Sequence, residues 1–102
     1  MKIVWTEPAV EDLRELHAYI ARDSELYASG FVERIISATE RLADHAEMGR
    51  VVPESSNETV RELLYQNYRI IYRVTSNRIE VLSVIHGARD LPGRGAAPWD
   101  VS

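Results

Sequence analysis

The stretch that most constrains the fold runs from residue 67 to residue 74 and reads Asn-Tyr-Arg-Ile-Ile-Tyr-Arg-Val. Every second residue is aromatic or β-branched, and the residues between them are mostly arginine. A period of two with this contrast is typical of an amphipathic β-strand. The apolar side of such a strand needs a cover, and Arg69 and Arg73 on the other side need a ligand or acidic partners.

Two further segments, residues 60–65 and 78–86, flank this strand and also have strand character. The short connections between the segments predict an antiparallel meander. Residues 78–86 are apolar on both faces, which indicates a central strand that is partly covered on its second face as well. Residues 2–5 form a short apolar run, and we predict a strand at the sheet edge or paired with a later strand.

Two helices are predicted between the first strand and the meander. Thr6 is a plausible N-cap for a helix over residues 8–22, and Ser24 can cap a second helix over residues 25–45. Apolar residues recur at helical spacing in both segments. The short break between them predicts an antiparallel helical hairpin. Gly49 is predicted to end the second helical region as a left-handed cap.

These elements together predict an α+β fold of order β-α-α-β-β-β. The helical hairpin packs on one face of a small twisted antiparallel sheet, and we expect the opposite face to stay open. No change in composition divides the chain, so residues 1–91 are expected to form a single domain. Residues 92–102 form an irregular tail, which Trp99 either docks onto the body or leaves frayed.

Composition narrows the functional classes. The chain has no cysteine, which excludes disulfides and thiolate metal sites. No spacing of histidine and acidic residues indicates a metal site, and no glycine-rich loop indicates a phosphate cradle, so we expect no metal and no cofactor. No apolar run approaches the ~20 residues of a membrane span, and the N-terminus lacks the features of a signal peptide. We therefore expect a cytoplasmic protein with no membrane partner.

The charge is unevenly distributed along the chain. The formal net charge of −4 argues against a general nucleic-acid binder. Residues 1–49 carry five basic and ten acidic side chains, a net of −5, whereas residues 50–102 carry seven basic and six acidic side chains, a net of +1. All basic residues except Lys2 are arginine, which favours bidentate recognition of carboxylate or phosphate; a GC-rich genome is an equally good explanation.

Guanidinium groups gather near one imidazole on the predicted open face. Such a surface suits a phosphodiester, because arginine stabilises a pentavalent phosphate while histidine or glutamate transfers a proton. The competing interpretation is that the arginines pair with Glu62 and Glu80 on neighbouring strands, at ~0.2–1 kcal/mol each. We prefer pairing for each arginine except Arg69, because a β-branched residue would give more stability at its mid-strand position. The candidate residues are Glu54, Arg61, Arg69, Arg73, His86 and Arg89.

A series of short motifs runs through the chain: Ala9-Val10-Glu11-Asp12-Leu13, Phe31-x-x-x-Ile35 with Leu42, Met48-Gly49-Arg50, Val60-Arg61-Glu62-Leu63, Tyr68-Arg69-Ile70-Ile71-Tyr72-Arg73-Val74 and Val84-Ile85-His86-Gly87-Ala88-Arg89. In order and spacing, these motifs resemble the RelE/ParE superfamily of toxins from bacterial type II toxin–antitoxin modules. The resemblance covers about residues 1–91. It implies a helical hairpin on an antiparallel sheet and a role in growth arrest or plasmid stabilisation.

The resemblance implies two alternative mechanisms. ParE-like members poison DNA gyrase and are not known as enzymes, whereas RelE-like members are ribosome-dependent mRNA endoribonucleases. The long hairpin, the ending Met48-Gly49-Arg50 and the scarcity of lysine favour the ParE-like branch. The alternative is a metal-independent mRNA interferase in which Glu54, Arg69 and His86 match the glutamate, arginine and histidine of some superfamily nucleases. The catalytic tyrosine near the C-terminus of other nucleases in the family has no counterpart here.

The resemblance also implies partners. Both branches are neutralised by a co-expressed antitoxin whose flexible segment wraps the toxin, so a toxin–antitoxin hetero-oligomer is expected. The target is DNA gyrase in the ParE-like reading and the ribosome with mRNA in the alternative. We expect Arg61, Arg69 and Arg89 to contact the antitoxin or the target. A third hypothesis is a folded module that binds its antitoxin but is no longer toxic.

Overall fold

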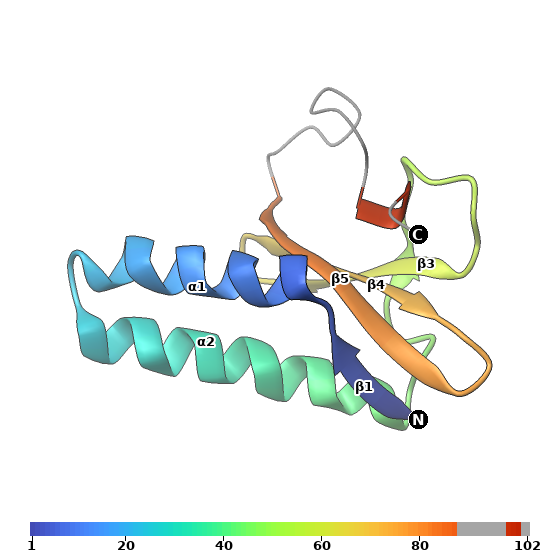
Figure 1. Ribbon diagram of the computed structural model, residues 1–102, viewed down its shortest axis with the longest axis horizontal. Helices are drawn as coiled ribbons and strands as arrows, with labels where there is room; N and C mark the ends of the chain where they lie inside the picture. The colour runs from blue at the N-terminus through green and yellow to red at the C-terminus, as the bar shows by residue number, and fades with distance from the viewer. Residues whose placement is uncertain (88–97, 101–102) are drawn as a thin grey trace.

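The computed structural model describes residues 1–87 and 98–100, so the predicted site residue Arg89 and most of the predicted tail lie outside the described residues. Across the described part of the chain, a helical hairpin packs on one face of a five-stranded sheet (Figure 1). The strand order is β1-β5-β4-β3-β2. The strands are β1 (Lys2–Trp5), β2 (Arg50–Val51), β3 (Val60–Tyr65), β4 (Tyr68–Val74) and β5 (Arg78–His86).

The sheet confirms the predicted fold class and adds a detail of topology. Strands β3, β4 and β5 form the predicted antiparallel meander. Strand β1 pairs with β5 in parallel, with Lys2 opposite Arg78, so the sheet is mixed. The tight turn between β3 and β4 places Gln66 at a φ of 51°, a left-handed conformation of the kind that two-residue hairpins require.

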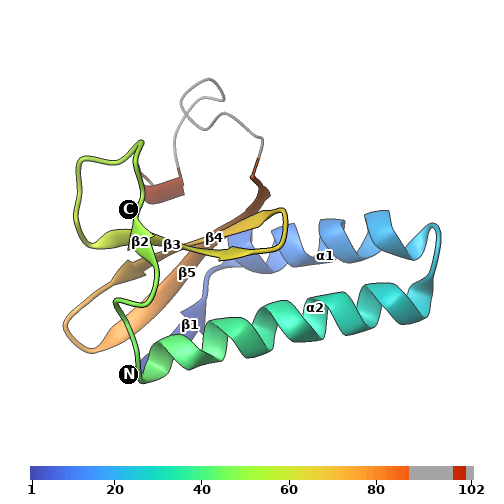
Figure 2. The same ribbon diagram turned by 180° about the vertical axis from the view of Figure 1, so that it is seen from behind.

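The helices begin where their caps predict. In α1 (Glu7–Ala21) the Thr6 hydroxyl accepts a hydrogen bond from the backbone N–H of Ala9, and in α2 (Glu25–Glu40) the Ser24 hydroxyl accepts one from Tyr27. Helix α2 ends before the predicted residue 45, because the chain tightens into a 3₁₀ turn over Arg41–Ala43. The two helices lie antiparallel across the sheet in both views (Figures 1 and 2). Neither helix has the length and hydropathy to cross a membrane within the described residues.

The main core lies between the hairpin and the sheet. Apolar residues from both helices meet the apolar side of β4 and β5, as the alternation of the central strand predicts. Partly buried aromatic residues of β1, β3 and β4 pack around this core. Its buried residues are Ala9, Leu13, Leu16, Phe31, Ile35, Ile70, Val81 and Val84.

The opposite face of the sheet is partly covered, so the expectation that it stays open is wrong, whereas the partial cover predicted for the second face of residues 78–86 is confirmed. A second apolar cluster covers part of it, formed by Val52, Val60, Ile71, Leu82 and Ile85, with Trp99 packed against it. A β-bulge accounts for the presence of Ile85 in this cluster. Ile71 lies opposite Ser83 while the next residue, Tyr72, lies opposite Val81, so Leu82 is an extra residue in β5. The bulge shifts the alternation, and Ile85 therefore points away from the helices although simple alternation groups it with Ile79 and Val81.

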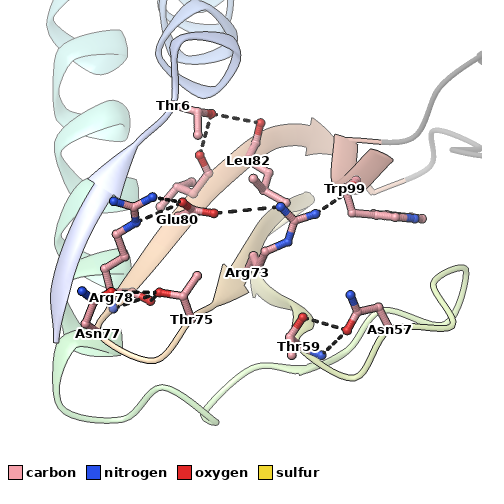
Figure 3. A network of polar contacts seen from close by, with 11 residues as sticks. Thr6, Asn57, Thr59, Arg73, Thr75, Asn77, Arg78, Glu80, Leu82 and Trp99 are labelled. Carbon is pink, nitrogen blue, oxygen red and sulfur yellow. Dashed lines mark hydrogen bonds and ion pairs between the residues drawn. The ribbon is translucent and has the colours of Figure 1, made fainter. Parts of the chain in front are cut away.

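Arg73 binds the C-terminal segment, residues Pro98–Asp100, to this second face. Its guanidinium donates a hydrogen bond to the backbone carbonyl of Trp99 at 2.5 Å and lies 4.0 Å from the Glu80 carboxylate (Figure 3). Glu80 also accepts from Arg78. The predicted pairing of Arg73 with Glu80 is confirmed, so Arg73 has a structural explanation. Of the two alternatives left open for Trp99, docking or fraying, the structure shows docking.

Candidate functional site

Arg69 is the second residue of β4, between Leu64 on β3 and Ile85 on β5, so it lies near the start of the strand and not at the predicted mid-strand position. Its alternation with Tyr68 and Ile70 directs it away from the helices, as predicted. The residue is only 7% exposed. A guanidinium at this depth needs charge partners, because an unpaired buried charge is strongly destabilising.

Two glutamates supply those partners. The Nε–H of Arg69 donates to Oε1 of Glu62 at 2.5 Å. Its terminal nitrogens donate to both carboxylate oxygens of Glu54, at 3.0 and 2.8 Å. The second contact is a bidentate fork, the strongest common geometry for an arginine and a carboxylate. Arg69 is therefore held on two edges of its guanidinium plane.

Arg50 extends these contacts into a network. Glu62 is 1% exposed, and its second oxygen accepts from the Nε–H of Arg50 at 2.5 Å. We call Glu54, Arg69, Glu62 and Arg50 the Arg69 network. It contains two acidic and two basic side chains, so its formal charge is zero. Arg50 was not predicted as a site residue; its role depends on the pairing of β2 with β3, which places it opposite Glu62.

The network shifts the ionisation of its members. Hydrogen bonding from Arg69 holds the pKa of Glu54 below its ordinary value, although partial burial opposes the effect. Hydrogen bonding to Glu54 raises the pKa of Arg69, again against burial. Both side chains are therefore charged at neutral pH, and each stabilises the charge of the other.

A surface pocket of about 490 Å³ opens beside the network. His86 reaches it from the end of β5, where it lies opposite Tyr68 with ring centroids 5.4 Å apart. The structure thus brings the predicted catalytic residues Glu54, Arg69 and His86 to one pocket. Its lining residues are Arg50, Pro53, Glu54, Leu64, Gln66, Asn67, Tyr68, Arg69, His86 and Gly87.

Arg61 does not join Arg69. It pairs with Tyr72 across β3 and β4, on the side of the sheet that faces the helices, and its guanidinium donates to the carbonyl of Gly49 at 2.8 Å. The strand period places it on the opposite face from Glu62, its neighbour in sequence. Grouping Arg61 with Arg69 on one face is therefore wrong. Arg89 lies outside the described residues.

Gly49 positions the start of β2, which carries Arg50. The prediction of a left-handed cap is wrong, since Gly49 does not have a left-handed backbone. The position requires glycine because of contact: an added Cβ would lie 2.4 Å from the carbonyl oxygen of Glu62 and 2.6 Å from the hydroxyl of Tyr72. That hydroxyl accepts from the N–H of Gly49 and donates to the carbonyl of Ala46. Burial raises the pKa of Tyr72, so it remains a donor.

The chemistry available at the pocket is that of an arginine, a histidine and a carboxylate. Within residues 1–87 and 98–100 no group of three or more histidine and acidic side chains is arranged to hold a metal ion. Acid–base work would fall to His86 and Glu54, and anion binding to Arg69 and Arg50. In the structure, however, Arg69 already binds the carboxylate that a nuclease would use as its base.

Comparison with known proteins gives consistent matches. The model of the ParE toxin of the type II toxin–antitoxin system parDE matches residues 3–91. The chain is 33% identical over 89 residues to Toxin RelE2 of Caulobacter vibrioides, covering 86% of this chain and 97% of that protein. It is 34% identical over 93 residues to Putative toxin Y4kP of Sinorhizobium fredii, covering 89% and 93%.

Two solved structures from toxin–antitoxin systems have a similar fold. A chain of the chromosomal ParDE system from P. aeruginosa superposes with a TM-score of 0.71 at 25% identity, covering 84% of this chain and 95% of that one. A chain of the toxin–antitoxin complex RelBE2 from Mycobacterium tuberculosis superposes with a TM-score of 0.56 at 20% identity, covering 83% and 95%. The second match supports the fold alone.

Proposed function

The chain belongs to the ParE toxin family of type II toxin–antitoxin systems, and we propose that it acts by binding its target, with DNA gyrase as that target, rather than by catalysis. The observation that carries this proposal is the state of Arg69. A phosphate clamp must present its terminal guanidinium nitrogens to the ligand. Here both of those nitrogens donate to Glu54, and the inner edge donates to Glu62.

Charge supports the same conclusion. The Arg69 network is formally neutral, so it does not attract a polyanion as an uncompensated arginine pair would. Elsewhere the chain is acidic overall, with a net charge of −4, and Lys2 is its single lysine. Electrostatic attraction supplies a large share of the affinity of proteins that bind nucleic acids. Binding to a protein target is therefore the better fit.

The second candidate is a ribosome-dependent mRNA endoribonuclease. One observation favours it: Glu54, Arg69 and His86 line the same pocket. In this mechanism Arg69 stabilises the charge on the phosphate, and His86 with Glu54 transfers protons. The fork between Arg69 and Glu54 would have to open first, because the same guanidinium edge cannot hold the carboxylate and a phosphate together.

We also propose a cognate antitoxin as the partner and the cytoplasm as the site of action. The ParDE and RelBE2 structures that this fold matches come from toxin–antitoxin systems. A hetero-oligomer of toxin and antitoxin is the corresponding assembly.

Two assays run in parallel test the proposal. The purified protein should inhibit DNA supercoiling by gyrase and leave mRNA on translating ribosomes intact. The opposite pair of results would reject the gyrase proposal in favour of the nuclease. In that event Arg69→Gln and His86→Ala should abolish cleavage while circular dichroism shows an unchanged fold. Arg78→Gln is a matched control, since Arg78 is an exposed arginine that contacts Glu80 outside the pocket.

A further inference from the structure

Glu54 reaches Arg69 from a loop, is partly exposed, and contacts it only through the two oxygens of its carboxylate, as a bound carboxylate ligand would. We infer that the outer edge of Arg69 is an exchangeable carboxylate site, at which an acidic side chain of a partner protein replaces Glu54. This inference deepens the proposed binding function and rests on it. It assigns Glu54 the role of an internal competitor that occupies the site in the free toxin.

The receiving side of the site is buried and held by a second ion pair. Glu62, which has no exposed side-chain surface, holds the inner edge of Arg69 from β3, and Arg69 itself belongs to β4, the central strand of the sheet. The outer edge presents two parallel N–H donors, the geometry that fits the two oxygens of a carboxylate. Removing Glu54 would therefore leave the fork in place, with Glu62 and Arg50 still holding it.

The present occupant can leave without a change in the sheet. Glu54 lies in the loop between β2 and β3, and its side chain is 24% exposed. The ends of this loop are anchored independently: the N–H of Val52 donates to the carbonyl of Val60, and the side chain of Asn57 accepts from the N–H of Thr59 (Figure 3). In the inferred exchange the Glu54 side chain rotates toward solvent, and the hydrogen bonds of the sheet are kept.

The charge of the network and the apolar residues around the pocket indicate which group can take the place of Glu54. Without Glu54, the remaining network carries Arg69, Arg50 and Glu62, a net of +1, which one monoanion balances. A nucleic acid brings many further negative charges to a protein of net charge −4. Leu64, 56% exposed, lies in the pocket wall beside Pro53 and Tyr68. An acidic side chain next to an apolar one on a partner protein fits this combination of a charged fork and an apolar rim.

The test uses the full chain and three small probes. The probes are acetyl-Leu-Glu-N-methylamide, its Leu-Gln counterpart, and the dinucleotide UpU as a phosphodiester. Binding is followed at the Arg69 Nε–H resonance in ¹⁵N-edited NMR spectra of the wild type, Glu54→Ala and Glu54→Gln. Glu58→Ala is the matched control, because it removes another loop glutamate that does not line the pocket.

The Leu-Glu probe should half-saturate Glu54→Ala at a concentration at least about tenfold below that needed for the wild type and for Glu58→Ala. The reason is that Glu54 lowers the apparent affinity of the wild type to the fraction of molecules in which the Arg69 fork is open. The Leu-Gln probe should bind to none of them. Equal binding to the wild type and both Glu54 variants, or no binding, would overturn the inference. Binding of UpU in preference to the Leu-Glu probe would overturn its assignment to a protein carboxylate.

This outcome is separable from the proposed function. The probe titrations involve neither gyrase nor ribosomes, whereas the supercoiling assay does not measure the Arg69 resonance. A toxin that fails to inhibit gyrase but shows the predicted titration would retain the carboxylate site and lose only the assignment of the target.

Discussion

Arg69 lines the candidate pocket, and its guanidinium is at the same time bound by two glutamates of the chain. Its two glutamate partners differ in kind. Glu62 belongs to a strand and is buried, whereas Glu54 belongs to a loop and is partly exposed. The contact with Glu62 compensates the charge of the buried guanidinium. The contact with Glu54 occupies the two terminal nitrogens. The two carboxylates should therefore respond differently to mutation and to pH.

Replacing Glu62 with glutamine should destabilise the fold severely. The change keeps the shape but removes a buried charge that serves both Arg69 and Arg50, and breaking a buried ion pair costs about 3–5 kcal/mol. Urea unfolding of the wild type and Glu62→Gln measures the difference. Glu80→Gln is the control, because its main partner is the exposed Arg78 and the expected loss is below about 1 kcal/mol. Equal losses for the two variants would contradict the assigned role of Glu62.

Glu54 should give the stability a dependence on acidic pH. Its folded-state pKa is lowered by Arg69, so its contribution is present above the unfolded-state pKa and is lost as the pH falls through the folded-state value. The difference in unfolding free energy between the wild type and Glu54→Gln should stay constant above the ordinary value of 4.5 and shrink below it. Urea unfolding at a series of pH values measures this difference. If the difference in unfolding free energy grew as the pH fell, the contact between Arg69 and Glu54 would not be the source of the pH dependence.

At the scale of elements, the start of β2 depends on close backbone approach. Gly49 lies against the carbonyl of Glu62 and the ring hydroxyl of Tyr72, and both contacts are to groups held by the sheet. The residue therefore sets how β2 approaches β3 and, through it, where Arg50 meets Glu62. This is a constraint of packing rather than of backbone conformation.

Gly49→Ala and Gly30→Ala should have opposite effects on stability. At Gly49 the new methyl group meets backbone at 2.4 Å, and overpacking of this kind costs about 1–3 kcal/mol. At Gly30 it meets only the end of the Arg34 side chain at 3.2 Å, and alanine is better in a helix by up to about 1 kcal/mol. Thermal unfolding of both variants provides the comparison. A neutral effect of Gly49→Ala would show that β2 can shift away from Glu62.

At the scale of the whole molecule, the sheet is covered on both faces by very different structures. The helical hairpin covers one face, and the loop before β3 with the segment Pro98–Asp100 covers part of the other. Figure 1 shows this short segment returning to the sheet on the side away from the helices. Two members of the second cluster are strand partners of the arginines on this face: Ile85 lies opposite Arg69 and Val60 opposite Arg73.

Trp99→Ala should lower stability even though it is distant in sequence from the sheet. The side chain packs on the second apolar cluster while remaining half-buried, so we expect a loss of about 1–3 kcal/mol, less than for a fully buried tryptophan. Tyr19→Ala is the control, since Tyr19 is exposed and its loss should fall within about 0.5 kcal/mol. Chemical denaturation of both variants gives the comparison. If the two losses were equal, the docking of Trp99 would contribute nothing.

Local patterns were sufficient for much of the fold. The alternation around Tyr68 predicted the central strand, Thr6 and Ser24 predicted the helix starts, and the short connections predicted the meander. They could not reveal the bulge at Leu82, because an extra residue in one strand is defined only against its partner. For the same reason the open second face was wrong: Val52 and Trp99 cover it from segments with no strand pattern of their own.

The candidate site divides in the same way. Residue type and alternation are local properties, and they were enough to predict that Arg69 points away from the helices and that Glu54 and His86 are candidate site residues. The contacts of Arg69 with Glu54 and Glu62, the addition of Arg50 to the network and the position of Arg61 on the other face became known from the three-dimensional arrangement. Those contacts depend on strand register and on the path of a loop, which bring charges together across separations that no local pattern records.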